Sequence, residues 1–508
     1  MKKNTMKRIL ALILVAALIL TMVISVVVSS ISSQGDSHRG HSHAQAEEII
    51  RNRYTMDIEL IEDQQALRVS QRLDFYNDTG DSLDRVMFSL YGNMFRRHLT
   101  VMYEDQDAMP WGYAPGGVEF RSVKVNGQSA DWGLSGEGEY FMRVACDLRP
   151  GEECAFEFEY DVLLSENAAF LGVGGADWRL SGFYPTVCVY TDGIWEANTP
   201  VQHSRYTLTH AADYDVTLTL PENYDVAATG REEVISAKDG VCVWSIRAEN
   251  IREFAISCGR AWRKYSAETD SGVEISVYSA SRLGGPRALE MAVEAVKLYE
   301  GWFGEFPMEQ LDIAESGYGL EKLPFEGCLW IEKSLFETGN RDELKYVVRL
   351  GLAEQYFGLA VYADPSADSW LCAAVCEYIT YLAWEEIEGE SAFLQRLNLR
   401  MAPSLQVTVP GDLYVVTDAT LFTQAQYDVV VRDRGAAVMH EFRVAVGREA
   451  FISALAAYYA GCRDLDIVTE MDFLRAINGA TGKDWEEFLT ELLFNIDEYS
   501  NQTIEWFE

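Results

Sequence analysis

The chain has 508 residues, of which 48% are hydrophobic and 12% aromatic. This is the composition of a folded protein with two or three domains and not that of a disordered chain. The net charge of −37 disfavours nucleic acid and anionic membrane surfaces as partners, because both would repel the chain. An acidic surface could instead attract cationic peptides.

Residues 1–31 predict a transmembrane signal-anchor. Four basic residues precede an apolar run from Ile9 to Val28, and a helix of about 20 residues is enough to cross a bilayer. The basic flank favours a cytoplasmic N-terminus, so we expect a single-pass protein of the cell membrane whose bulk is extracytoplasmic. Cleavage after Ala46 is the alternative, although that position lies far beyond the apolar run. Residues 32–49 are expected to form a polar linker.

Residues 50–262 predict an antiparallel β domain. Apolar side chains alternate from Tyr54 to Leu60 and from Leu67 to Phe75, with the period of two that is typical of strands burying one face. Turn sequences separate such runs, and Asn126-Gly127 is the strongest hairpin signal among them. Further strands are expected at 214–221 and 241–246.

Residues 263–508 predict a mainly helical domain. Apolar residues recur with helical spacing from Leu289 to Tyr299, and further helices are expected at 342–362, 370–384 and 435–446. Short strands are expected early in this part, at 311–314 and 328–331. The whole chain is therefore predicted to be an α+β multidomain protein.

The nine cysteines are scattered and odd in number, and most lie within apolar segments where a free cysteine behaves as a small buried hydrophobe. Cys146 and Cys154 flank the turn Arg149-Pro150-Gly151. They could face each other across a hairpin, so one disulfide between them is an option in an exported protein. No spacing resembles a zinc knuckle.

Residues 347–378 have the frame of a zinc-peptidase active site. In such a site a helix carries H-E-x-x-H, which places two imidazoles one turn apart and a glutamate between them to deprotonate the metal-bound water. The corresponding helix of this chain offers Leu350, Gly351 and Glu354. The frame is thus present without its zinc-binding residues.

Several motifs resemble those of the membrane alanyl aminopeptidase (aminopeptidase N) family of zinc gluzincin metallopeptidases. Gln355-Tyr356-Phe357-Gly358 is similar to the end of that family's zinc-binding helix, and Asp368-Ser369-Trp370-Leu371 to the start of its next helix. Phe303-Gly304-Glu305-Phe306-Pro307 and Arg432-Asp433-Arg434-Gly435 resemble two further motifs. The resemblance runs from about Tyr54 to Asp497. It implies a thermolysin-like catalytic-type domain behind the β domain, as a short form without a C-terminal helical domain.

The family's functional positions have changed in this chain. Aligned without a gap, the resemblance places the two zinc-binding histidines on Leu350 and Glu354, and the general base on Gly351. The third zinc ligand falls on Ala373 and the transition-state tyrosine on Arg432. Leucine and alanine cannot ligate zinc, and one carboxylate without imidazoles is a poor site, so no zinc cofactor is expected.

The family's exopeptidase motif is also altered. Gly319-Leu320-Glu321 resembles it, but matching the strand that follows would put Pro324 on the family's glutamate. Glu321 and Glu326 are both candidates for binding the amino terminus of a peptide. We also expect Arg432, if it occupies the tyrosine's place, to pair with Glu354 across the vacated site. Glu354 and Arg432 are therefore peptide-binding candidates as well.

Two functions follow from this degenerate site. The first is a non-catalytic relative, a pseudopeptidase that binds a peptide or protein outside the membrane. The alternative is an active zinc-dependent aminopeptidase whose metal site is rebuilt, with Cys372, Glu354 and His440 as the residues that could form it. A regulatory subunit of a transporter or of an active peptidase is a third option, and no residue supports it.

Overall fold

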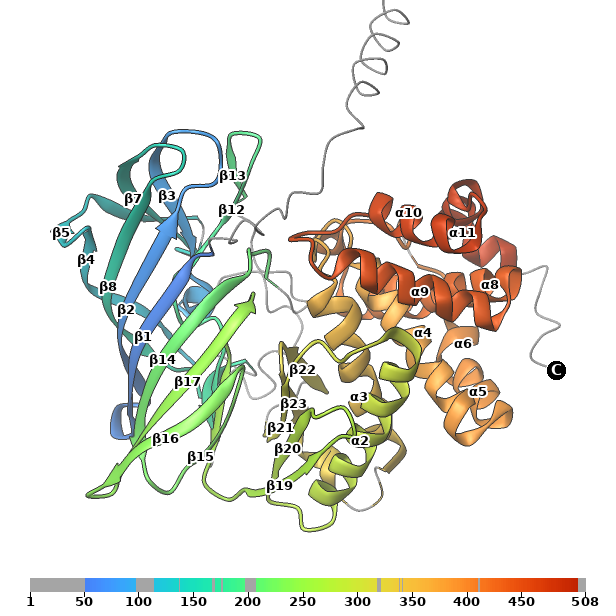
Figure 1. The fold of residues 1–508 in the computed structure, drawn as a ribbon, viewed down its shortest axis with the longest axis horizontal. Coiled ribbons are helices and arrows are strands. Elements are labelled where there is room, and N and C mark those ends of the chain that lie inside the picture. Colours follow the sequence, from blue (N-terminus) through green and yellow to red (C-terminus); the bar gives the residue numbers. More distant parts are fainter. Residues whose placement is uncertain are drawn as a thin grey trace, which may run out of the picture. The chain divides into compact units, whose positions relative to one another are not determined.

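Strands fill the first half of the described chain and helices most of the second (Figure 1). The computed structural model describes residues 51–500 except 97–113, 137, 167–169, 175–176, 197–206, 318–320, 338, 340 and 410–411, and side chains up to 496. The residues from Arg51 onward form one compact unit. The predicted signal-anchor and linker lie outside the described residues. No helix in the described ranges is both long and apolar enough to cross a membrane.

The largest sheet among the described residues has eight strands in the order β16-β17-β14-β1-β2-β8-β4-β5. Its strands are β1 (Arg53–Ile61), β2 (Ala66–Tyr76), β4 (Gly117–Val125), β5 (Gln128–Ser129), β8 (Glu153–Leu163), β14 (Ala212–Pro221), β16 (Arg231–Lys238) and β17 (Val241–Ile251). The predicted alternation is confirmed, because β1 buries every second side chain from Tyr54 to Leu60. The expectation of purely antiparallel pairing is wrong in one place, since β1 and β14 are parallel.

Positive backbone φ angles explain why two of the predicted turn sequences close hairpins. Asn126 and Gly127 have φ of 50° and 77° between β4 and β5, and Asp239 and Gly240 have 57° and 79° between β16 and β17. Two consecutive positive φ angles define the turn that matches strand twist, and Asn, Asp and Gly tolerate them best.

Three smaller sheets complete the β-rich part of the described chain. Their strands are β3 (Leu83–Ser89), β6 (Trp132–Ser135), β7 (Phe141–Leu148), β9 (Leu171–Gly174), β10 (Asp177–Leu180), β11 (Thr186–Val187), β12 (Val189–Thr191), β13 (Ile194–Glu196), β15 (Asp225–Ala228) and β18 (Ile256–Gly259). Cys146 on β7 and Cys154 on β8 belong to different sheets, so the expected hairpin between them does not form. Both cysteines are free.

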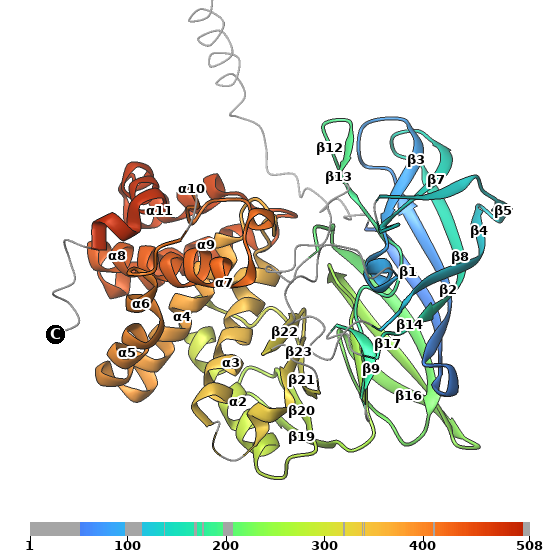
Figure 2. The same cartoon turned by 180° about the vertical axis from the view of Figure 1, so that it is seen from behind.

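A mixed sheet of five strands supports the candidate site, in the order β19-β20-β21-β23-β22. Its strands are β19 (Arg263–Glu268), β20 (Glu274–Ser279), β21 (Gln310–Ser316), β22 (Lys322–Phe325) and β23 (Cys328–Glu332). Helix α2 (Gly284–Phe303) connects the parallel strands β20 and β21. In both views α2 and α3 (Arg341–Glu354) cover one face of this sheet (Figures 1 and 2).

Except for the short α6, the remaining α-helices of the described chain share one apolar core with this sheet. They are α4 (Trp370–Glu388), α5 (Glu390–Arg396), α6 (Ala402–Ser404), α7 (Gln424–Tyr427), α8 (Gly435–Val446), α9 (Arg448–Cys462), α10 (Glu470–Thr481) and α11 (Glu486–Ser500). Three π-helical segments of the described chain accompany these helices: η5 (Gln355–Ala360) follows α3, η6 (Leu397–Met401) follows α5, and η8 (Asp428–Arg434) precedes α8. The predicted α+β class is confirmed, with a β-rich N-terminal part followed by a helical one.

Candidate functional site

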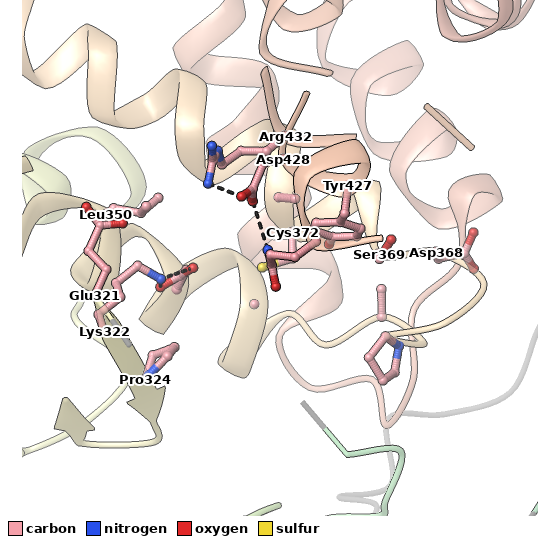
Figure 3. Close-up of a pocket in the computed structure, with 16 residues that line it drawn as sticks. Glu321, Lys322, Pro324, Leu350, Asp368, Ser369, Cys372, Tyr427, Asp428 and Arg432 are labelled. Atoms are coloured by element: carbon pink, nitrogen blue, oxygen red, sulfur yellow. Dashed lines mark hydrogen bonds and ion pairs between the residues drawn. The ribbon is translucent and has the colours of Figure 1, made fainter. Parts of the chain in front are cut away.

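One pocket in the helical part gathers most of the residues that the sequence singled out (Figure 3). Strand β22, helices α3, α4 and α7, and the segment η8 all contribute to its walls. Its lining consists of Glu321, Lys322, Pro324, Leu350, Glu354, Gly358, Ala363, Pro365, Asp368, Ser369, Cys372, Ala373, Gln424, Tyr427, Asp428 and Arg432. Its cavity of about 80 Å³ has room for only a few water molecules.

Four of the five residues that the resemblance places at the family's functional positions lie in this pocket. Helix α3 carries Leu350 and Glu354 one turn apart, so both project from the same face of the helix. Helix α4 contributes Ala373, and η8 contributes Arg432. The structure therefore brings together residues that are up to 82 positions apart in the sequence (350 to 432).

The fifth position, Gly351, faces away from the pocket lining and against strand β23. A Cβ atom added to Gly351 would lie 2.7 Å from a methyl carbon of Leu329, a side chain with no exposed surface. Real Cβ atoms do not approach so closely, so Leu329 fills the space into which a longer side chain would begin. A larger residue at position 351 would therefore need the buried Leu329 side chain to move.

Glu354 is paired with Lys322, a residue that sequence reasoning missed. The Lys322 ammonium donates to both carboxylate oxygens of Glu354, at 2.5 Å to Oε1, and the two side chains are only 8% and 12% exposed. The expected pairing of Glu354 with Arg432 is wrong, because Lys322 on β22 reaches the carboxylate instead. The sequence offered one indication of a role for Lys322, which is its position next to Glu321, a candidate for binding the amino terminus of a peptide.

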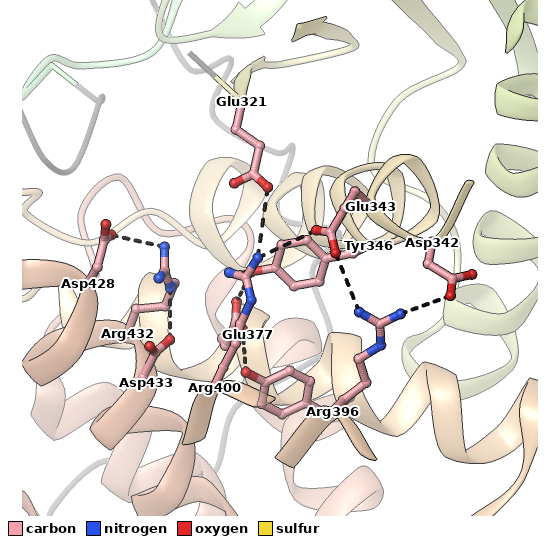
Figure 4. Close-up of polar contacts among 11 residues, drawn as sticks. Glu321, Asp342, Glu343, Tyr346, Glu377, Arg396, Arg400, Asp428, Arg432 and Asp433 are labelled. Atoms are coloured by element: carbon pink, nitrogen blue, oxygen red, sulfur yellow. Dashed lines mark hydrogen bonds and ion pairs between the residues drawn. The ribbon is translucent and has the colours of Figure 1, made fainter. Parts of the chain in front are cut away.

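Arg432 is held by acidic residues of its own segment. Its Nη1 donates to Asp428 Oδ1 at 2.9 Å and its Nε to Asp433 Oδ1 at 3.0 Å (Figure 4). Burial raises the pKa of Asp433 to about 6, although the neighbouring Arg432 guanidinium opposes that shift. Arg432 therefore lines the pocket with its charge already compensated by two carboxylates.

A buried polar network lies beside Arg432. Glu377 of α4 has no exposed surface and accepts hydrogen bonds from the hydroxyls of Tyr346, at 2.6 Å, and Tyr381, at 2.5 Å. Arg400 donates to the Tyr346 hydroxyl at 2.9 Å and stacks over its ring (Figure 4). Sequence reasoning missed Glu377, although it follows Ala373 by four residues and so lies on the same face of α4.

The two glutamates proposed to bind an amino terminus lie in different surroundings. Glu321 lines the pocket, and its carboxylate is 3.9 Å from the Arg400 guanidinium. Glu326 does not line it. The Glu326 side chain is 6% exposed and accepts a hydrogen bond from the backbone N–H of Arg252 at 2.9 Å, so it contacts the β-rich part of the chain.

The residues suggested for a rebuilt metal site are not brought together. Cys372 and Glu354 line the pocket, whereas His440 is buried beside Tyr378, with 2.8 Å between its Nδ1 and the Tyr378 hydroxyl. Burial and the nearby Arg443 lower the pKa of His440 to about 4. Within the described ranges, no group of three or more His, Cys, Asp and Glu side chains has the geometry to hold a metal ion. The side chains that line the pocket therefore do not provide the ligands that a catalytic zinc ion needs.

Comparison with known proteins defines the class of the fold. An M1 zinc metallopeptidase from Deinococcus radiodurans superposes with a TM-score of 0.64 at 17% identity, covering 87% of this chain and 93% of its own. A variant of that enzyme bound to a Tyr-Ser-Ala substrate superposes with a TM-score of 0.61 at the same identity and coverage. The chain thus has the fold of M1 metallopeptidases. No protein-family model matches its sequence.

Sequence comparison points to the aminopeptidase N family within that class. The chain is 26% identical over 212 residues to Aminopeptidase M1-B of Oryza sativa subsp. japonica, and 24% identical over 311 residues to Aminopeptidase N of Lactococcus lactis subsp. lactis. These matches cover 37% and 55% of this chain, but they span only 23% and 35% of those two relatives. The resemblance recognised from the motifs is confirmed, and this chain is related to the aminopeptidase N family.

Proposed function

We propose that this chain is a non-catalytic relative of the aminopeptidases that binds a peptide or a protein segment at the pocket between β22, α3, α4 and η8. The observation that carries the proposal is the pairing of Glu354 with Lys322 where the family's second zinc ligand is expected. Leu350 and Ala373 stand at the other two ligand positions and have no donor atoms. In this proposal the signal-anchor of residues 1–31 holds the protein on the outer side of the cell membrane.

The size of the pocket limits how a ligand would bind. A cavity of about 80 Å³ admits an amino group or a small side chain, so the rest of a peptide would lie over its mouth. The lining has four carboxylates, Glu321, Glu354, Asp368 and Asp428, against the two cations Lys322 and Arg432, so its formal charge is negative. A positively charged group of a peptide would be favoured there, which agrees with a chain of net charge −37.

The test uses the full chain purified in detergent and the tripeptide Tyr-Ser-Ala, which one of the similar structures contains. We expect calorimetry to detect binding and expect no hydrolysis of Tyr-Ser-Ala or of leucyl and alanyl amides. Ala373→Phe should abolish binding by filling the pocket, whereas Ala237→Phe on the exposed face of β16 should leave it unchanged. Turnover that a chelator abolishes would establish the alternative, an active metallopeptidase, and absence of peptide binding would contradict the proposed ligand class.

A further inference from the structure

The ion pair between Lys322 and Glu354 connects two elements that line the pocket. Lys322 is the first residue of β22, and Glu354 is the last residue of α3. The pair is nearly buried, with side-chain exposures of 8% and 12%, and the neighbouring Leu350 and Ala373 offer no polar atoms of their own. A carboxylate in such a place needs a cation within hydrogen-bond distance, because burial of an uncompensated charge is costly.

A metal ion would normally supply that cation at this place in the fold. We propose that the Lys322 ammonium is a built-in cation that takes the place of the family's metal ion. It compensates the carboxylate at the second ligand position, ties β22 to α3, and keeps divalent cations out of the pocket. This inference rests on the proposed function, and it identifies Lys322 as the residue that maintains the proposed loss of catalysis.

The exclusion follows from charge and from geometry. A metal ion bound by residue 354 would share its ligand with an ammonium that already contacts both carboxylate oxygens. A metal ion and an ammonium that contact the same carboxylate repel each other strongly, and the low exposure of the pair leaves little water to screen this repulsion. Restoring the ligands alone therefore does not restore an unhindered metal site.

The experiment compares two restored chains, in which Leu350→His and Ala373→Glu add two metal ligands and the Glu354 carboxylate stays as the third. Gly351 is kept, because Leu329 occupies the space beside it. One chain retains Lys322, and the other also carries Lys322→Met. Zinc content is measured by elemental analysis, and zinc affinity by competition with a chromophoric chelator. We expect zinc to bind about 100-fold more tightly when Lys322 is replaced.

A matched control carries Lys297→Met in the restored chain, since Lys297 is a 75% exposed lysine of α2. Its zinc affinity should equal that of the restored chain with Lys322. Lys322→Gln, which removes the charge but keeps a polar side chain, replaces Lys322→Met if the methionine variant does not fold.

Equal zinc affinity with and without Lys322 would overturn the inference, and so would absence of zinc from both restored chains when circular dichroism shows them folded. These outcomes are independent of the proposed function. Zinc titration of restored chains involves no peptide, and failure of the natural chain to bind Tyr-Ser-Ala would leave the zinc result unchanged.

Discussion

Position 354 shows how the role of a side chain in a pocket depends on the partner with which it pairs. The resemblance implied a histidine there, and the sequence offered a glutamate whose partner could only be guessed. Arg432 was the expected partner because the resemblance places it at another of the family's functional positions. The structure assigns that role to Lys322, and Arg432 pairs with Asp428 and Asp433. Ion pairs between distant residues depend on side-chain reach and packing, which spacing along the chain does not encode.

A double-mutant cycle measures what the Lys322–Glu354 pair contributes to stability. Lys322→Met alone should lower the free energy of unfolding by about 3 kcal/mol, because the Glu354 carboxylate stays nearly buried and loses its ammonium partner. Lys322→Met combined with Glu354→Leu should recover most of that loss, since an apolar pair of similar volume is often tolerated. Urea unfolding followed by circular dichroism gives both values.

The exposed pair Lys297–Asp270 provides the comparison. Its side chains are 75% and 93% exposed, so Lys297→Met should leave the unfolding midpoint unchanged. If the double variant at Lys322 and Glu354 is as unstable as the sum of the two single variants, the two side chains do not stabilise the fold through their interaction with each other.

At the scale of elements, the helices could be predicted more completely than their irregularities. The spacing of apolar residues predicted one helix over 342–362, and the structure begins α3 at Arg341 as expected. Regular helix ends at Glu354, however, and η5 follows with a non-helical residue at Phe357, where φ is −114°. A π-helical turn changes the hydrogen-bond spacing without changing composition, so the apolar pattern does not reveal it.

Gly351 illustrates the same limit of prediction from sequence, because its effect on stability depends on a neighbouring strand. Glycine inside a helix usually costs up to about 1 kcal/mol relative to alanine, so helix propensity alone predicts that Gly351→Ala stabilises the protein. We expect the opposite, a loss of about 1 kcal/mol, because the added Cβ would overlap the buried Leu329 side chain. Thermal unfolding of the variant checks the sign.

The control is Gly479→Ala in α10, where an added Cβ would meet no atom within 4 Å. This exchange should raise the melting temperature, since only helix propensity is altered. Gly351→Ala combined with Leu329→Val should be less destabilised than Gly351→Ala alone. A stabilising effect of Gly351→Ala by itself would show that Leu329 moves aside at no cost.

At the scale of the whole molecule, alternation and turn residues predicted several of the strands but not the contacts between the β-rich and helical parts. Arg252, just after β17, donates to Asp466 Oδ1 at 3.0 Å, and its backbone N–H donates to Glu326. These partners are 214 and 74 residues away. In the sequence Glu326 was a peptide-binding candidate and Asp466 had no assigned role, and only the folded arrangement shows that Arg252 connects them.

Glu253 lies in the same region and should make stability depend on pH near neutrality. Burial raises its pKa from 4.5 to about 7; hydrogen bonds from Ser181 and Thr207 oppose this shift and the charge of Glu326 adds to it. The folded state therefore binds more protons than the unfolded state between about pH 4.5 and 7, and stability falls as pH rises through that window. Above pH 7 the full cost of the buried charge, about 3 kcal/mol at most, is present.

Glu253→Gln removes this cost while keeping an oxygen that can accept the Ser181 hydroxyl. We expect the variant to melt at a higher temperature than the natural chain at pH 8, and the difference to shrink towards zero at pH 4.5. The matched control is Glu249→Gln, an exposed position on β17, the strand that ends two residues before Glu253, and it should shift the melting temperature equally little at both pH values. A difference at pH 8 that persists at pH 4.5 would mean that Glu253 acts through its shape or hydrogen bonds and not through its charge.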